Sequence, residues 1–273
     1  MARRNLFAAA MMLAACMCMV CATGAGAADQ DDSLKQILER GKVIVGVAAY
    51  IKPLAFTNPE TGEIVGLIPD LVSLYAKKLD VEVQYNDYKW AGLFPALDTN
   101  KVDFLAAHIT TTIPRTAKLN MTLPYVYTGS RILVRKDLPV KDLADLNSDK
   151  YTFGESKGSM YVEVVEKQFP KAKLNRYDSF TDSLQAMKAG RIDVTLDDEV
   201  IILFSGLKGN DDKFRVLSDN LSPQSYRWAC RMGDDQLRRS LDVFFQEIKL
   251  SGEYKALYEK WFGIPWEPRV LGY

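Results

Sequence analysis

Short segments rich in β-branched residues alternate with amphipathic segments along most of this 273-residue chain. The first kind has the length and composition of strands, and the second repeats apolar residues at the spacing of a helix. The expected strands are residues 42–47, 81–85, 102–109, 132–135, 151–153, 192–196, 214–217 and 226–231. The expected helices are one that opens at Asp70, one that starts within residues 92–97, and residues 160–168, 179–188, 234–250 and 253–261. This alternation predicts an α/β fold with helices on both faces of mainly parallel sheets.

Two short segments in different halves of the chain share one construction. Asn100-Lys101-Val102-Asp103 and Gly190-Arg191-Ile192-Asp193 each follow an expected helix, cross a turn and enter an expected strand. The similarity is weak, but it favours two lobes of similar build.

The N-terminal segment has the pattern of a secretory signal. Two arginines precede an apolar run from Leu6 to about Ala22, and small residues follow at positions 25–28. We expect cleavage after Ala27 or Ala28, so that residues 1–28 are a signal peptide. An uncleaved membrane anchor is an alternative, although the run is slightly short for a span.

A second alternative concerns Cys16, because Leu13-Ala14-Ala15-Cys16 resembles a lipobox. Lipidation of Cys16 would tether the protein to a membrane. The apolar run continues past Cys16, which favours ordinary cleavage.

Composition excludes several classes of function. Lysine and arginine total 35, as do aspartate and glutamate, so a general charge for nucleic-acid binding is absent. The chain has one histidine and four cysteines, and Cys230 is the only cysteine after residue 28. Zinc sites and iron–sulfur clusters built on histidine and cysteine are therefore disfavoured, although the histidine could still serve a catalytic triad. We expect no cofactor, no metal, and a monomer after cleavage, with no later membrane span.

An ordered set of motifs between about Gly41 and Gly263 resembles a known family. In chain order they are Pro53-Leu54-Ala55-Phe56, Gly66-x-x-x-Asp70, Trp90-x-x-Leu93-x-x-Ala96-Leu97-x-x-Asn100-Lys101-Val102-Asp103, Thr110, Thr112-Ile113-Pro114-Arg115, Met121-Thr122-Leu123-Pro124-Tyr125, Gly158-Ser159, Ala189-Gly190-Arg191-Ile192-Asp193, Asp198 and Lys260-Trp261-Phe262-Gly263. Their order and spacing resemble those of the family 3 extracellular solute-binding proteins, the amino-acid receptors of bacterial ABC importers.

The resemblance implies a fold, a location and a partner. Two α/β lobes are joined by two crossover segments, with the ligand between them. Residues 41–128 and 227–273 would form lobe 1, and residues 132–221 would form lobe 2. The protein would act in the periplasm and deliver an amino acid to an inner-membrane ABC permease, without catalysis.

Arg115 and Thr110 are the expected carboxylate site on lobe 1. A guanidinium presents a planar fork that matches a carboxylate, although an arginine in a loop is more often a solvated surface residue. The family pattern favours ligand binding, with the hydroxyl and backbone N–H of Thr110 beside it. On lobe 2, Ser159 is a helix N-cap, and the resemblance assigns the adjacent backbone N–H of Met160 to the same carboxylate.

Asp198 is the expected partner of the ligand's α-ammonium. It occupies the family's acidic position, five residues after Asp193, whereas its neighbours Asp197 and Glu199 are expected to be solvated. His108 lies on the same strand face as Thr110, so it either packs in the core or contacts the ligand amine. In the second case, uptake would depend on pH near neutrality.

Tyr50 and Trp90 are the expected walls of the side-chain pocket, although aromatic residues more commonly pack in the core. Ala48 stands where receptors for basic amino acids often carry an acid, which argues against a basic ligand.

Two other functions compete with a receptor. The same fold hosts a periplasmic cyclohexadienyl dehydratase, whose pattern has a glutamate three residues after the position of Asp198; this chain has Ile201 there. A sensor or an enzyme-appended module would continue beyond the fold, and we expect neither, because the sequence stops ten residues after Gly263.

Overall fold

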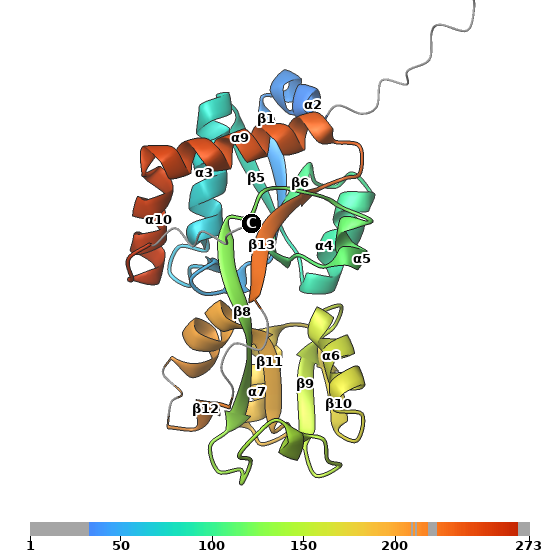
Figure 1. The fold of residues 1–273 in the computed structure, drawn as a ribbon. Coiled ribbons are helices and arrows are strands. Elements are labelled where there is room, and N and C mark those ends of the chain that lie inside the picture. The colour runs from blue at the N-terminus through green and yellow to red at the C-terminus, as the bar shows by residue number, and fades with distance from the viewer. Residues whose placement is uncertain (1–32, 209, 211, 218–222, 267–273) are drawn as a thin grey trace, which may run out of the picture. The chain divides into compact units, whose positions relative to one another are not determined.

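The computed structural model describes residues 33–208, 210, 212–217 and 223–266 (Figure 1). The expected signal peptide, residues 1–28, and the possible lipidation site at Cys16 lie outside the described residues and stay predictions. None of the described helices has the length and apolar character needed to cross a bilayer.

The first group of strands is built around β1 (Lys42–Val47), which pairs in parallel with both β5 (Glu82–Asp87) and β6 (Phe104–Thr110). Gly46 permits the close approach of β1 to β6, because a Cβ atom there would lie 2.7 Å from the Leu105 side chain. Around these strands lie α2 (Ser33–Arg40), α3 (Leu67–Leu79), α4 (Trp90–Asp98), α5 (Ile113–Thr116), α9 (Asp235–Ser251) and α10 (Glu253–Phe262). A small antiparallel sheet of β2 (Tyr50–Ile51), β3 (Ala55–Thr57) and β4 (Ile64–Val65) follows β1.

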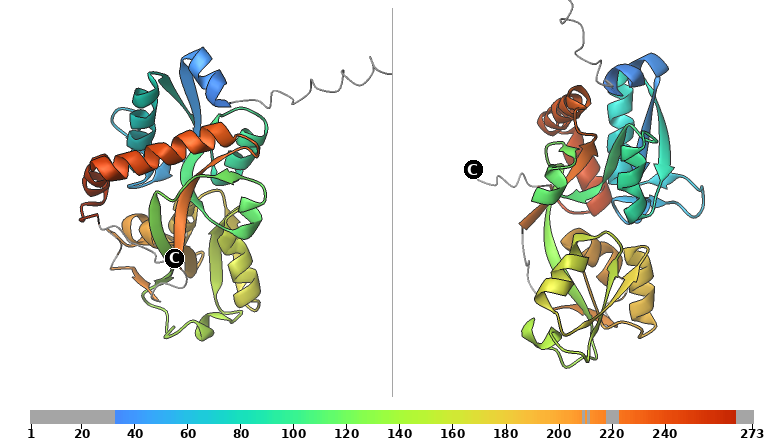
Figure 2. Two further views of the ribbon diagram at one scale, coloured as in Figure 1. Left: turned by 45° about the horizontal axis from the view of Figure 1, so that its top comes forward. Right: turned by 90° about the vertical axis from the view of Figure 1, so that its right-hand side faces the viewer.

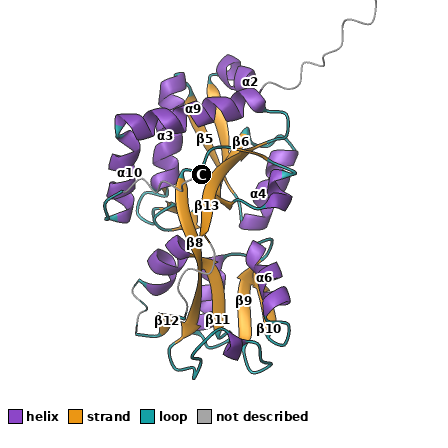
Figure 3. Cartoon of the chain, in the orientation of Figure 1, coloured by secondary structure: helices purple, strands orange, loops and turns teal. Residues whose placement is uncertain are grey.

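The second group has β9 (Thr152–Ser156) between β10 (Lys173–Tyr177) and β11 (Val194–Asp198), all parallel. Its other elements are α6 (Met160–Gln168), α7 (Phe180–Lys188), α8 (Glu199–Ile201), the π-helical turn η2 (Ile202–Leu207), the 3₁₀ turn η1 (Ala144–Leu146) and β12 (Phe214–Val216). Strand–helix alternation therefore occurs twice, as the sequence predicted (Figure 3).

Two strands, β8 (Val126–Arg135) and β13 (Pro223–Cys230), connect the two groups. Residues 126–129 of β8 pair with β13, and residues 130–134 of β8 pair with β11. At its other end β13 pairs with β6 and with β7 (Asn120–Met121). The order β10-β9-β11-β8-β13-β6-β1-β5 is therefore continuous, with antiparallel pairs only where β8 or β13 takes part. Figure 2 shows these two strands running between the groups.

Apolar side chains are buried on both faces of the strands. Every residue of β6 is buried, which includes both faces of that strand, and Leu237, Leu241, Phe244, Phe245 and Ile248 form the buried face of α9. Cys230 is also buried, as expected for a small apolar residue.

Some expected bounds were wrong. The strand expected at 132–135 begins at Val126, because its first half is a connecting strand that contains buried Thr128 and Gly129 rather than a β-branched run. The helix expected to open at Asp70 begins at Leu67, so Asp70 lies in its first turn. Helix α4 begins at Trp90, which places Pro95 beyond the first turn.

Candidate functional site

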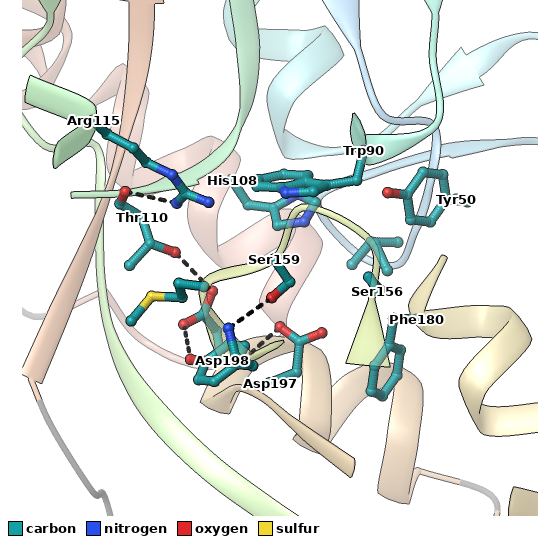
Figure 4. Close-up of a pocket in the computed structure, with 13 residues that line it drawn as sticks. Tyr50, Trp90, His108, Thr110, Arg115, Ser156, Ser159, Phe180, Asp197 and Asp198 are labelled. Atoms are coloured by element: carbon teal, nitrogen blue, oxygen red, sulfur yellow. Dashed lines mark hydrogen bonds between the residues drawn. The ribbon is translucent and has the colours of Figure 1, made fainter. Parts of the chain in front are cut away.

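One cleft brings together all eight residues that the sequence singled out (Figure 4). The space between its lining residues is about 380 Å³ and is partly open to solvent. The eight residues are Tyr50, Trp90, His108, Thr110, Arg115, Ser159, Met160 and Asp198. The remaining lining residues are Ile51, Ser156, Tyr161, Phe180 and Asp197, which the sequence analysis did not select.

Arg115 reaches the cleft from the short helix α5, which follows β6. The Thr112 hydroxyl caps this helix by accepting a hydrogen bond from the Arg115 backbone N–H, at 3.3 Å. The guanidinium donates through Nη1 to the Thr110 carbonyl at 3.0 Å, and its carbon lies 5.6 Å from the ring centroids of Trp90 and Phe94. Burial lowers the pKa of Arg115 from its ordinary value, but guanidinium remains protonated in proteins. The Arg115 guanidinium is thus a cation that faces the cleft and is held in place by the hydrogen bond from its Nη1 to Thr110.

Asp198 enters the cleft at the end of β11 and is only 2% exposed. The Tyr161 hydroxyl donates to its Oδ1 at 2.7 Å, and the Thr110 hydroxyl donates to its Oδ2 at 3.4 Å. Burial raises the pKa of Asp198 from 3.8 to about 6, against the opposing effect of Tyr161, Tyr226 and Thr110 hydroxyls and of Arg115. The Thr110–Asp198 bond joins β6 to β11, so the two strand groups meet at this carboxylate.

The N-terminus of α6 closes one side of the cleft. Gly158 precedes it with φ of 75°, a left-handed conformation that favours glycine. The Ser159 hydroxyl accepts a hydrogen bond from the Tyr161 N–H at 3.2 Å, so Ser159 is the N-cap that the sequence predicted. The Ser159 hydroxyl thus accepts a hydrogen bond from the backbone N–H of Tyr161 and not from that of Met160. The Met160 N–H is one of the groups at the start of a helix that have no hydrogen-bond partner within the helix. Trp90 Nε1 donates to the Gly158 carbonyl at 3.2 Å, a second contact between the strand groups.

His108 lies behind this surface against aromatic rings. Its ring centroid is 4.7 Å from that of Trp90 and 5.9 Å from that of Tyr226. Burial, with the charge of Arg115, lowers the pKa of His108 from 6.5 to about 3. The expectation that His108 titrates near neutrality is therefore wrong: the imidazole is neutral at pH 7. Its Nδ1 is buried and has no hydrogen-bond partner among the described residues.

Aromatic side chains form the walls of the cleft. Trp90 is almost completely buried, Phe180 comes from the start of α7, and Tyr50 comes from β2. Lys89 lies at the outer side, with Nζ 5.5 Å from the Tyr50 ring centroid. Ala48 is buried in the core and does not line the cleft, so no acid enters at that position.

Asp197 is the main site residue that the sequence analysis missed. We expected it to be solvated, as in most runs of adjacent acids, and this was wrong: Asp197 lines the cleft beside Asp198. Its Oδ1 accepts a hydrogen bond from the Asp198 N–H at 2.8 Å. Burial, followed by the charge of Asp198, raises the pKa of Asp197 well above 3.8. Both acids reach the cleft because β11 ends there. At the end of a strand, consecutive side chains no longer have to point to opposite faces of the sheet.

Glu199 was also expected to be solvated, but it pairs with Arg131 at 2.7 Å. Tyr161 was missed because a tyrosine on an amphipathic helix is usually a core residue, and nothing in its spacing marks the hydrogen bond to Asp198. Ile201, at the position of the dehydratase glutamate, is buried and is not among the lining residues of the cleft.

Comparison with known proteins finds relatives that cover most of the chain. L-cystine-binding protein TcyJ of Escherichia coli (strain K12) is 28% identical over 232 residues, which is 84% of this chain and 86% of that protein. A mutant of ArgBP from T. maritima is 32% identical, with a TM-score of 0.78, and the match covers 85% of this chain and all of that chain. The ancestral amino acid-binding protein AncCDT-1, a precursor of cyclohexadienyl dehydratase, is 29% identical with a TM-score of 0.76, covering 85% of this chain and 99% of that chain.

The two-lobed architecture of such binding proteins agrees with the two connected strand groups described above. The model of the bacterial extracellular solute-binding proteins, family 3, matches residues 43–264. This chain belongs to that family.

Proposed function

We propose that this protein is a receptor that binds an amino acid between its two lobes and delivers it to an ABC-type permease. The observation that carries the proposal is the convergence of Arg115 and Asp198 on one cleft from different strand groups. A guanidinium on one side and a carboxylate on the other select a zwitterion. The names of the relatives support the class of ligand, since they bind cystine and, for ArgBP, arginine.

Each side chain has a role in this proposal. Arg115, the hydroxyl and N–H of Thr110, and the N-terminal turn of α6 at Ser159 and Met160 bind the ligand carboxylate. Asp198 binds the α-ammonium. A neutral imidazole has one ring nitrogen without a proton that can accept a hydrogen bond, and we assign the unpartnered Nδ1 of His108 to this role toward the same ammonium. Tyr50 and Trp90 enclose the ligand side chain.

Ligand binding would be coupled to closure of the two lobes. We assign residues 41–128 with 227–273 to lobe 1 and residues 132–221 to lobe 2, with β8 and β13 as the connections. Direct bonds already link the two sides: Ser205 Oγ donates to the Lys52 carbonyl at 2.8 Å, and Thr181 Oγ1 donates to the Tyr50 carbonyl at 3.4 Å. A ligand that contacts both lobes gains all its bonds only in the closed arrangement, and this differential affinity stabilises closure.

The receptor would be exported by its N-terminal signal and would act in the periplasm as a monomer, with an inner-membrane ABC permease as its partner. The description of the family as extracellular supports this location.

A thermal-shift screen tests the proposal. The purified protein, unfolded in denaturant and refolded to remove any bound ligand, is heated with each of the common amino acids and with related carboxylates. A ligand that binds only the folded state raises the melting temperature, and titration calorimetry then gives its affinity. Absence of any stabilisation by an α-amino acid would refute the proposal.

A cyclohexadienyl-dehydratase-like enzyme is the alternative. It is supported by the similarity to AncCDT-1, and it is disfavoured because Ile201 is apolar and buried where an acid is needed. Incubation of the protein with prephenate and arogenate, followed by product analysis, distinguishes the two functions.

A further inference from the structure

Asp197 is a second carboxyl group in the cleft, and the proposed roles above do not use it. Figure 4 shows Arg115 and Thr110 on one side of Asp198, and Asp197, Phe180 and Tyr50 toward the other. Charge effects agree with this arrangement: Arg115 acts on the pKa of Asp198, whereas Asp197 is the carboxylate that acts most on Tyr50. Asp197 therefore lies on the side of the cleft where Tyr50, a proposed wall of the side-chain pocket, is found.

Asp197 lacks a positive partner within the described part of the chain. The strand register places Arg131 of β8 opposite Asp197, but the Arg131 guanidinium pairs with Glu199 at 2.7 Å. Lys89 has its Nζ 5.5 Å from the Tyr50 ring centroid, and no ion pair between Lys89 and Asp197 is found among the described residues. The only hydrogen bond found for the Asp197 carboxylate in that part of the chain is the one from the Asp198 N–H. A carboxylate in this position is desolvated without compensation.

The charges that line the cleft do not balance for a neutral ligand. Arg115 contributes one positive charge, Asp197 and Asp198 contribute two carboxyl groups, and His108 is neutral because burial lowers its pKa to about 3. A zwitterion with an uncharged side chain adds no net charge, so only one of the two carboxyl groups has a cation to balance it when both are ionised, and the pKa of Asp197 is raised accordingly. An amino acid with a cationic side chain brings the total to zero and gives Asp197 a charge-assisted hydrogen bond.

The walls of this part of the cleft suit such a side chain. Tyr50 and Phe180 offer aromatic surface to the methylene groups, and a ring face attracts an ammonium or guanidinium group. Ala48, which stands where receptors for basic amino acids often carry an acid, belongs to the proposed lobe 1. Asp197 supplies an acid from the other lobe.

We infer that Asp197 is a specificity residue that binds the cationic group of the ligand's side chain, so that the ligand is a basic amino acid such as arginine, lysine or ornithine. The inference rests on the proposed receptor function.

Calorimetry with matched ligand pairs tests the inference. L-arginine is compared with L-citrulline, in which a neutral urea group replaces the guanidinium, and L-lysine is compared with L-norleucine, which lacks the ammonium. A charge-assisted hydrogen bond predicts that the wild-type protein prefers the charged member of at least one pair by roughly tenfold or more. Asp197→Asn should remove most of that preference and change the affinity for the neutral member by less than about threefold. Asp178→Asn is the control, because Asp178 is an exposed acid that pairs with Lys157 and does not line the cleft; this variant should keep the preference.

Three outcomes separate the inference from the proposed function. Preference of the wild-type protein for neutral amino acids or for L-cystine would overturn the inference and leave the receptor function intact. Equal selectivity of Asp197→Asn and the wild-type protein would overturn the role of Asp197. Failure of every amino acid, charged or neutral, to bind would overturn the receptor function itself. The wild-type comparison decides the ligand class even if Asp197→Asn does not fold.

Discussion

Asp198 should destabilise the ligand-free protein at neutral pH, and its replacement by asparagine should reveal this. Burial raises the pKa of Asp198 from 3.8 to about 6. A raised carboxyl pKa means that the folded state binds the proton more tightly than the unfolded state does. The contribution of Asp198 to stability is therefore greatest below about pH 4, falls as the pH rises from about 4 to about 6, and is constant above that range.

The magnitude follows from the size of the shift. A change of about two pKa units corresponds to about 3 kcal/mol of unfolding free energy lost above pH 6. Asp198→Asn removes the charge and keeps an oxygen that can accept the hydrogen bond from Tyr161. The variant should thus be more stable than the wild-type protein at pH 7.5, by up to about 3 kcal/mol. Removal of the charge also lowers the pKa of neighbouring Asp197, which acts in the same direction.

Urea unfolding of both ligand-free proteins at pH 4, 5, 6 and 7.5 measures the effect. The difference in unfolding free energy should be near zero at pH 4 and grow to its maximum above pH 6. Asp178→Asn serves as a control, because Asp178 is exposed, pairs with Lys157, and has a lowered pKa. A less stable Asp198→Asn protein at pH 7.5, or a difference that does not vary with pH, would refute the reasoning.

Three further predictions concern ligand binding. Arg115→Ala should abolish amino-acid binding measured by calorimetry while the circular dichroism spectrum is unchanged, because the guanidinium is the fixed cation of the cleft. Affinity for the amino acid should fall as the pH drops below about 6, because a protonated Asp198 no longer attracts an ammonium group; His108→Gln should not move the midpoint, since the pKa of His108 is about 3. Tyr161→Phe should shift that midpoint to higher pH, because the Tyr161 hydrogen bond lowers the pKa of Asp198.

Each of these predictions has its own control or contrary result. Arg239→Ala is the control for Arg115→Ala, because Arg239 is an exposed residue of α9, and this variant should bind ligand normally. Unchanged affinity of Arg115→Ala would refute the assignment of Arg115 to the ligand carboxylate. If the pH midpoint of ligand affinity moves in His108→Gln, the group that titrates is His108 and not Asp198. A downward shift in Tyr161→Phe would show that the hydroxyl does not stabilise the ionised carboxylate.

The sequence predicted the regular elements well where local pattern decides them. The bounds of β1 and α6 were predicted correctly, because β1 is a β-branched run and α6 starts with a serine cap after Gly158. The bounds of β8 were wrong, because a strand that passes from one group to the other pairs with different neighbours along its length, and its sequence carries no single pattern.

The candidate site shows the same division. Arg115, Thr110 and Asp198 could be named in advance because family motifs mark them, and all three line the cleft. What the sequence determined by itself was the alternation of strands and helices and the capping residues, since these depend on neighbours along the chain. The set of polar groups suited to a zwitterion came from the resemblance to the family.

Only the tertiary structure decided the protonation and the surroundings of those groups. The pKa of His108 is low, and that of Asp198 is high, because residues distant in sequence exclude water around them. Asp197 could not be distinguished from a solvated acid until β11 was seen to end at the cleft. Burial and charge balance are sums over residues that meet only in the folded chain, and no local pattern contains them.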